Sequence, residues 1–156
     1  MTQDPEASRT LVLDTSVAVK FYVREEMHEE ALSVLAAAES GIVELIAPDT
    51  IQPEFLNALW WKYRRGEFSR EEVRKGWERF TEDEAASLYA LEDLMARAAG
   101  ITLETGVIVY DALFLALAEE METPLVTADD KLLRATRATK YSRLAQSLTE
   151  WTLDRR

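Results

Sequence analysis

The sequence predicts an α/β fold with a mainly parallel central sheet. Short apolar or β-branched segments alternate with longer segments whose apolar residues recur at helical spacing, the pattern of strands joined by crossover helices. Asp14 and Asp129 stand at or just beyond the ends of two short segments, where parallel sheets bind ligands. The 156 residues suit one domain. We predict it over residues 11–150, between a flexible N-terminus at 1–10 and a C-terminal tail at 151–156.

Helix caps and chain breakers set the element boundaries in the first half. Pro48 stops an apolar run, and Gly41 lies beyond the helix before that run. Ser69, with Glu72 three residues later, forms a capping box that opens a helix. The predicted elements are strands over 11–13 and 42–47, a short helix or turn over 15–22, and helices over 27–38, 49–64 and 70–80.

Gly100 and Pro124 divide the second half of the chain. Residues 81–84 are expected to open a separate segment, and residues 88–99 to form a helix that Gly100 ends. Residues 101–110 are ambiguous, because their last four positions favour a strand but lead directly into a helix. The remaining predicted elements are a helix over 111–118, a strand over 125–126, a helix over 131–138 and a strand over 144–148.

The composition excludes several kinds of site. The chain has no cysteine and one histidine, His28, which rules out disulfide frameworks, thiolate zinc sites, a cysteine nucleophile and multi-histidine metal centres. A formal net charge of −11, from 18 basic and 29 acidic residues, repels nucleic acid unless bases cluster locally or metal ions intervene. Residues 1–10 lack a signal-peptide stretch, and the apolar runs are shorter than the ~20 residues that cross a bilayer. We expect a cytoplasmic protein without a membrane partner.

Four acidic residues lie beside apolar segments: Asp14, Glu54, Asp111 and Asp129. An unpaired buried carboxylate is costly, and few bases lie near these four in sequence. If the four converge, a divalent cation is the simplest way to offset their mutual repulsion, and carboxylates alone suit Mg²⁺ or Mn²⁺. Taken singly, Glu54 could be an ordinary first-turn glutamate and each aspartate an ordinary helix N-cap.

Four segments carry these carboxylates: Val12-Leu-Asp-Thr-Ser16, Pro53-Glu-Phe-Leu-Asn57, Tyr110-Asp-Ala-Leu-Phe-Leu-Ala-Leu-Ala118 and Pro124-Leu-Val-Thr-Ala-Asp129. In this order they resemble the acidic motifs of PIN domains, and most closely those of VapC-type toxins, the ribonucleases of bacterial and archaeal toxin–antitoxin pairs. The resemblance implies a three-layer α/β/α sandwich and a Mg²⁺- or Mn²⁺-dependent endoribonuclease site that acts on RNA. It also implies frequent homodimers and inhibition by a cognate antitoxin.

The resemblance also implies which residues act. The catalytic residues that it implies are four carboxylates that bind the metal, Asp14, Glu54, Asp111 and Asp129. They are joined by two hydroxyl residues, Ser16 and Thr127. Thr15 is the alternative to Ser16 for the small hydroxyl beside the first aspartate, and Asp130 falls at a variable position next to Asp129. In such a site, carboxylates hold the metal and can accept the proton of the attacking water.

Basic residues concentrate in two places. Residues 131–149 contain five bases and no acid, and a second cluster follows the Glu54 segment. These bases are Lys131, Arg134, Arg137, Lys140 and Arg143, and Lys62, Arg64 and Arg65. On a helix, the threefold spacing of the first group would make a drifting stripe. Both groups are candidate contacts for the RNA backbone, with a solvated face or a docking surface for an acidic partner as alternatives.

Trp60 and Trp61 are adjacent, so they cannot both face the core from one helix. We expect one of them in the core and the other in a dimer or antitoxin groove.

Other functions fit the residues less well. A haloacid-dehalogenase-like phosphatase needs a second aspartate two residues after Asp14, where Ser16 stands, and a phosphate-receiver domain needs an acidic pair near this strand. No Gly-rich phosphate loop is present. The remaining alternative is a non-catalytic PIN-like module that binds RNA or protein.

Overall fold

The structure is a computed structural model that describes residues 9–151. Five strands, all parallel, form one sheet in the order β3-β2-β1-β4-β5. The strands are β1 (Arg9–Leu13), β2 (Val43–Pro48), β3 (Ser87–Tyr89), β4 (Leu125–Thr127) and β5 (Ala145–Ser147). The predicted α/β class with a parallel sheet is confirmed. β1 starts two residues earlier than predicted, and the rest of the predicted terminal segments, at 1–8 and 152–156, lies outside the described residues.

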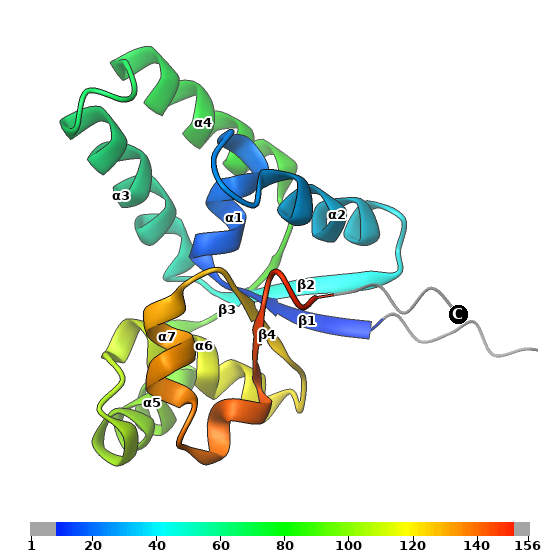
Figure 1. Cartoon of the computed structure of the whole chain (residues 1–156), viewed down its shortest axis with the longest axis vertical. Helices are drawn as coiled ribbons and strands as arrows, with labels where there is room; N and C mark the ends of the chain where they lie inside the picture. The colour runs from blue at the N-terminus through cyan, green and yellow to red at the C-terminus, as the bar shows by residue number, and fades with distance from the viewer. Residues whose placement is uncertain (1–8, 152–156) are drawn as a thin grey trace, which may run out of the picture.

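Helices cover both faces of the sheet and make the three-layer sandwich that the resemblance implied (Figure 1). One face carries α1 (Thr15–Tyr22), α2 (His28–Glu39), α3 (Ile51–Arg64) and α4 (Arg70–Asp83). The other carries α5 (Leu91–Thr105), α6 (Val109–Glu120) and α7 (Asp130–Thr136). A short 3₁₀ helix, η1 (Lys140–Arg143), leads into β5.

Helix α6 is the most deeply buried helix of the fold. Every side chain from 112 to 118 is buried, because the helix lies between the sheet and α5 (Figure 1). Apolar burial contributes about 25 cal/mol per Å², so this uninterrupted run anchors the helix firmly. The rigid placement matters because Asp111 lies in its first turn.

Helix α3 buries one narrow face and exposes the other. Ile51, Phe55 and Leu59, spaced four residues apart, are fully buried and fill the contact with the rest of the domain. Trp60 and Trp61 are 45% and 54% exposed. The prediction that one of them lies in the core is therefore wrong, because the buried face is already occupied.

The predicted boundaries between residues 81 and 110 need correction. Helix α4 continues to Asp83, so residues 81–84 open no new element. The strand β3 replaces the start of the predicted 88–99 helix, and α5 then passes through Gly100 to end before Gly106, whose φ is 75°. The β-rich residues 107–110 form no strand: the last two of them are the first residues of α6, which therefore begins before the predicted position 111.

No single helix among residues 9–151 is long and apolar enough to span a membrane. Helices α5 and α6 together reach the necessary length and composition, but a bend of 113° separates them.

The strand order creates a switch point between β1 and β4. From β1 the chain builds outward to β2 and β3 on one side, and later to β4 and β5 on the other. The connections therefore leave these two central strands in opposite directions, which opens a crevice at their carboxyl ends. Asp14 follows β1 and Asp129 follows β4, so both border this crevice.

Candidate active site

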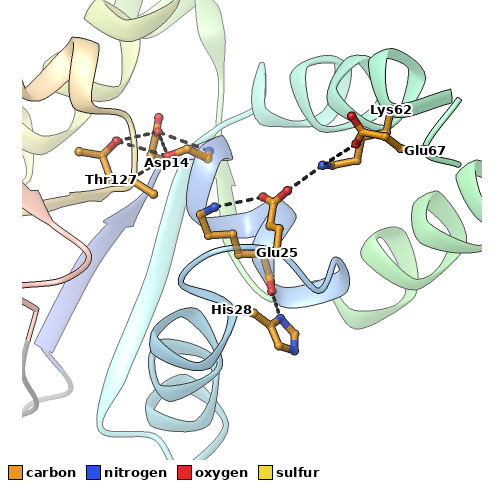
Figure 2. Close-up of polar contacts among 9 residues, drawn as sticks. Asp14, Glu25, His28, Lys62, Glu67 and Thr127 are labelled. Atoms are coloured by element: carbon orange, nitrogen blue, oxygen red, sulfur yellow. Dashed lines mark hydrogen bonds and ion pairs between the residues drawn. The ribbon is translucent and has the colours of Figure 1, made fainter. Parts of the chain in front are cut away.

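Asp14 is the innermost carboxylate of the crevice. It is 5% exposed and serves as the N-cap of α1. Its Oδ2 atom accepts hydrogen bonds from the hydroxyl of Ser16 and from Thr127 Oγ1, the latter at 2.9 Å (Figure 2). The backbone N–H of Ser16 approaches the same oxygen at 3.4 Å. Capping and hydrogen bonding thus hold one carboxylate oxygen in place.

Ser16 and Thr127 connect the segment after β1 with the segment after β4. The backbone N–H of Ala128 donates to Ser16 Oγ at 2.9 Å, and that of Asp129 donates to Thr127 Oγ1 at 3.0 Å. Thr127 is completely buried. These hydrogen bonds hold the connection between β4 and α7 in place, and so they position Asp129 relative to Asp14.

Asp129 is the N-cap of α7, and its Oδ1 atom accepts from the backbone N–H groups of Lys131 (2.9 Å) and Leu132 (3.3 Å). It is half-buried, whereas Asp130 is exposed. The charge of Asp129 also acts on Asp14 and Asp111, so Asp129 is the member of the doublet that faces the crevice.

Glu54 reaches the crevice from the first turn of α3. Thr15 Oγ1 donates a hydrogen bond to Glu54 Oε2 at 3.1 Å. The second oxygen, Oε1, is buried and has no hydrogen-bond partner within residues 9–151. An unsatisfied buried carboxylate oxygen is costly, and either a cation or a transferred proton would satisfy it.

Asp111 lies in the first turn of α6, two positions after that helix begins. It is therefore not the N-cap, which is Ile108. Its carboxylate is half-buried and experiences the charges of Asp14, Asp129 and Lys131. The fourth carboxylate thus reaches the crevice from the helical layer opposite α3.

Burial and mutual repulsion perturb three of the four carboxylates. Burial raises the pKa of Asp14 above its ordinary value; hydrogen bonds from Ser16 and Thr127 oppose the rise. Burial, and then the charge of Asp14, raise the pKa of Glu54 to about 7. Burial and the charge of Asp14 likewise raise the pKa of Asp111 to about 6. The cluster therefore resists full ionisation unless positive charge is added.

The donor set fits a hard divalent cation. In the described part of the chain, no three histidine, cysteine, aspartate or glutamate side chains form a ready-made metal cage. This arrangement still suits Mg²⁺, which keeps several waters and takes one or two carboxylates directly. The raised pKa values indicate that nearby positive charge does not compensate full ionisation of the cluster, and Glu54 Oε1 has no hydrogen-bond partner within residues 9–151. The assignment of all four carboxylates as metal ligands stays a prediction.

Thr15 and Ser16 are not alternatives for one role. The first binds Glu54 and the second binds Asp14, so each hydroxyl orients a different carboxylate. The sequence left Thr15 and Ser16 as alternatives for one position, because the sequence at a strand–helix junction does not show in which directions adjacent side chains point. The one sign in the sequence that both residues act was the pair of consecutive hydroxyl residues directly after Asp14.

Lys62 does not belong with the exposed bases. Its Nζ atom lies 2.7 Å from Glu25 Oε2 and 3.6 Å from Glu67 Oε2, and its side chain is only 12% exposed. Glu25 also binds Lys20 Nζ at 3.1 Å (Figure 2). This lysine therefore joins α3 to the loop after α1, and its contact with RNA stays a prediction.

Sequence reasoning missed this ion cluster because its partners are far apart in the chain. Burial opposes ionisation of Glu25, but hydrogen bonds from Lys62 and Lys20 outweigh it, so the pKa of Glu25 lies below its ordinary value. His28 Nδ1 donates to the Lys20 carbonyl oxygen at 2.6 Å (Figure 2). This hydrogen bond connects the first residue of α2 to α1, so His28 has a structural role.

The five bases after Asp130 do not form one helical stripe. Helix α7 ends at Thr136, with Arg137 as its C-cap, and Lys140 and Arg143 belong to η1. Lys140 Nζ lies 3.7 Å from Glu104 Oε2. Lys131, Arg134 and Arg137 are exposed, and their contact with RNA stays a prediction.

Comparison with known proteins identifies relatives of this architecture. The model of the PIN domain family matches residues 11–138. Ribonuclease VapC3 of Pyrobaculum aerophilum is 33% identical over 126 residues, which cover 78% of this chain and 91% of the relative. The crystal structure of PAE2754 from Pyrobaculum aerophilum has the same fold, with a TM-score of 0.65, 20% identity, and coverage of 91% of this chain and 92% of that one.

Proposed function

The chain belongs to the PIN domain family, and from this premise we propose that it is a metal-dependent endoribonuclease of the VapC type. It would hydrolyse RNA phosphodiester bonds at the crevice bordered by Asp14, Glu54, Asp111 and Asp129. The main structural support is Glu54, whose Oε1 atom is buried and unpaired while its pKa is raised to about 7. A 33% identical relative that bears the name ribonuclease supports the same class.

The four carboxylates would hold Mg²⁺ or Mn²⁺, in part through waters that the ion retains. When bound, the ion supplies neutralisation of the charge that develops on the phosphate and activation of the attacking water. The protein contributes preorganisation: Ser16 and Thr127 hold Asp14, and Thr15 holds Glu54. Fixed ligands cost little reorganisation during the reaction.

Glu54 is the proposed proton acceptor. The oxygen of a water bonds to phosphorus, and one proton of that water passes to Glu54 Oε1. The bond to the leaving oxygen breaks, and this oxygen keeps the electron pair and takes a proton from solvent. Glu54 Oε1 has no competing hydrogen-bond donor among the described residues. A carboxylate whose pKa is raised toward neutrality is better suited to this transfer than an ordinary one.

The proposed partners follow from the same class. We propose neutralisation by a cognate antitoxin and a homodimeric state. The exposed apolar side chains of α5 and the start of α6, including Leu103 at 87% and Ile108 at 53% exposure, offer a surface for a second copy. Light scattering of the wild type and of Leu103→Glu tests this, since a charge there should weaken self-association.

The proposed activity is tested with labelled single-stranded RNA. Cleavage should require Mg²⁺ or Mn²⁺ and stop with EDTA, and Asp14→Asn should abolish it by removing charge with little change in shape. Preparations of wild type and variant must be freed of contaminating ribonuclease in the same way. Cleavage that persists in Asp14→Asn would exclude this site. RNA binding without metal-dependent cleavage by the wild type would favour the non-catalytic alternative.

The phosphatase alternative lacks support at position 16. Ser16 occupies the place where a second aspartate would stand, and its hydroxyl binds Asp14 and accepts from the Ala128 N–H. The residue is thus used to orient Asp14.

A further inference from the structure

The exposed face of α3 begins at the candidate active site. Asn57, Trp61 and Arg64 follow Glu54 by three, seven and ten residues, a spacing that places them on one side of the helix. Trp61 therefore lies about 10 Å from Glu54 along the axis. Side chains on a helix generally lean toward its N-terminus, which is the end of α3 that carries Glu54. Figure 1 shows α3 running outward from the edge of the sheet.

Trp60 and Arg64 extend this face. The Arg64 guanidinium lies 6.0 Å from the centroid of the Trp60 ring, a cation–π geometry. Arg64 is exposed, and within residues 9–151 it makes no ion pair with an acid. Its neighbours Lys62 and Arg65 do pair with acids, Arg65 with Glu67 at 2.7 Å. Arg64 is therefore available to an anion from outside.

Arg64 gives this face a positive charge, although the whole protein carries −11. Residues 55–66 contain no acid, and of their three bases Lys62 and Arg65 pair with acids from outside this segment. The other exposed apolar region, on α5 and the start of α6, lies in a stretch from 98 to 130 that contains no base. Of the two regions, only the α3 face combines exposed aromatic rings with positive charge.

We propose that the α3 face formed by Asn57, Trp60, Trp61 and Arg64 binds the single-stranded RNA that flanks the cleaved phosphate. The inference rests on the proposed function and adds the path that the substrate takes. Bases stack on the two indoles, and a backbone phosphate pairs with Arg64. Stacking on aromatic side chains is tolerant of sequence, so the face binds the strand without selecting particular bases.

The test measures RNA binding separately from cleavage. The background is Asp111→Asn with Mg²⁺ present, and the probe is a short fluorescein-labelled single-stranded RNA. Trp61→Ala should raise Kd by about 5- to 100-fold with an unchanged salt dependence. Arg64→Ala should raise Kd and also lower the slope of log K against log salt by about 0.7. Trp61→Phe, which keeps a stacking surface, should recover most of the affinity.

Ile42→Ala is the matched control, because Ile42 is an exposed apolar residue that precedes β2 and so lies at the opposite edge of the sheet from the crevice. Its Kd should equal that of the background. Thermal melting checks the fold of each variant. Equal affinity of Trp61→Ala and the background would overturn the inference. If the same variant loses self-association or antitoxin binding while RNA binding is unchanged, the face belongs to a protein partner, which also overturns it. Failure of the proposed function is a separate result: no metal-dependent cleavage by the wild type.

Discussion

Thr15 Oγ1 donates a hydrogen bond to Glu54 Oε2 at 3.1 Å, across 39 positions of sequence. The contact joins the first turns of α1 and α3. Burial and the charge of Asp14 raise the pKa of Glu54, and this hydrogen bond opposes the rise. Thr15 therefore controls how readily Glu54 ionises, although it carries no charge itself.

Thr15→Val should move the acidic limb of the pH–activity profile toward higher pH. Loss of the hydrogen bond to the ionised carboxylate favours its protonated form, and activity near pH 7 should fall by roughly tenfold. Thr15→Ser keeps the hydroxyl and is the control, with a profile close to wild type. The measurement is initial cleavage rate from pH 5.5 to 9. Parallel profiles for the valine variant and wild type would contradict this role.

Metal-free protein should lose stability as pH rises from about 4 to about 7. The folded-state pKa values of Glu54 and Asp111, about 7 and about 6, exceed their ordinary values of 4.5 and 3.8. The folded state therefore holds these protons more tightly than the unfolded state. Their effect favours folding below the ordinary values and is lost as pH passes through the raised ones. Melting in EDTA at pH 5.5 and 7.5, for wild type and Glu54→Gln, measures the contribution; the variant should show a smaller decrease.

Millimolar Mg²⁺ or Mn²⁺ should raise the melting temperature at pH 7.5 by about 2–4 °C and much less at pH 5.5. The ion binds ionised carboxylates, and protons compete for the same oxygens. Asp14→Asn should reduce the increase. A melting temperature at pH 7.5 that does not respond to either metal would count against the proposed metal site.

Lys62→Met should destabilise the fold and leave the salt dependence of RNA binding unchanged. Removing Lys62 leaves Glu25, which is half-buried, with Lys20 as its remaining basic partner, and the loss should be about 1–3 kcal/mol. Urea denaturation measures it. The exposed Arg64→Ala is the comparison, with little change in stability. If Lys62→Met lowers the slope of log K against log salt, Lys62 does contact RNA.

The double variant Arg134→Ala and Arg137→Ala should bind RNA more weakly and with a smaller salt dependence, while metal-induced stabilisation is preserved. Both side chains are exposed, Arg134 in the last turn of α7 and Arg137 at its C-cap, and each lost phosphate contact lowers the slope by about 0.7. Fluorescence anisotropy over a range of salt concentrations provides the test. An unchanged slope would assign these arginines to solvent or to a protein partner.

Local sequence patterns predicted the parts of the fold that local interactions stabilise. Ser69 and Glu72 form the predicted capping box, because both partners lie within one helical turn. β3 was missed because it has three exposed residues and exists through its pairing with β2. Gly100 did not end α5, since packing against α6 stabilises the helix beyond the modest cost of one glycine.

The sequence by itself determined that Asp14 and Asp129 lie at the same edge of a sheet, because alternating apolar and helical segments specify a parallel sheet and the carboxyl ends of its strands share one edge. That their strands are neighbours was decided by the tertiary structure. Only the tertiary structure decided that Thr15 and Ser16 bind different carboxylates, that Lys62 is neutralised by Glu25, and that both tryptophans of α3 are exposed. The physical reason is distance along the chain. Burial and ion pairing depend on residues that folding brings together from far apart, and Lys62 and Glu25 are 37 positions apart.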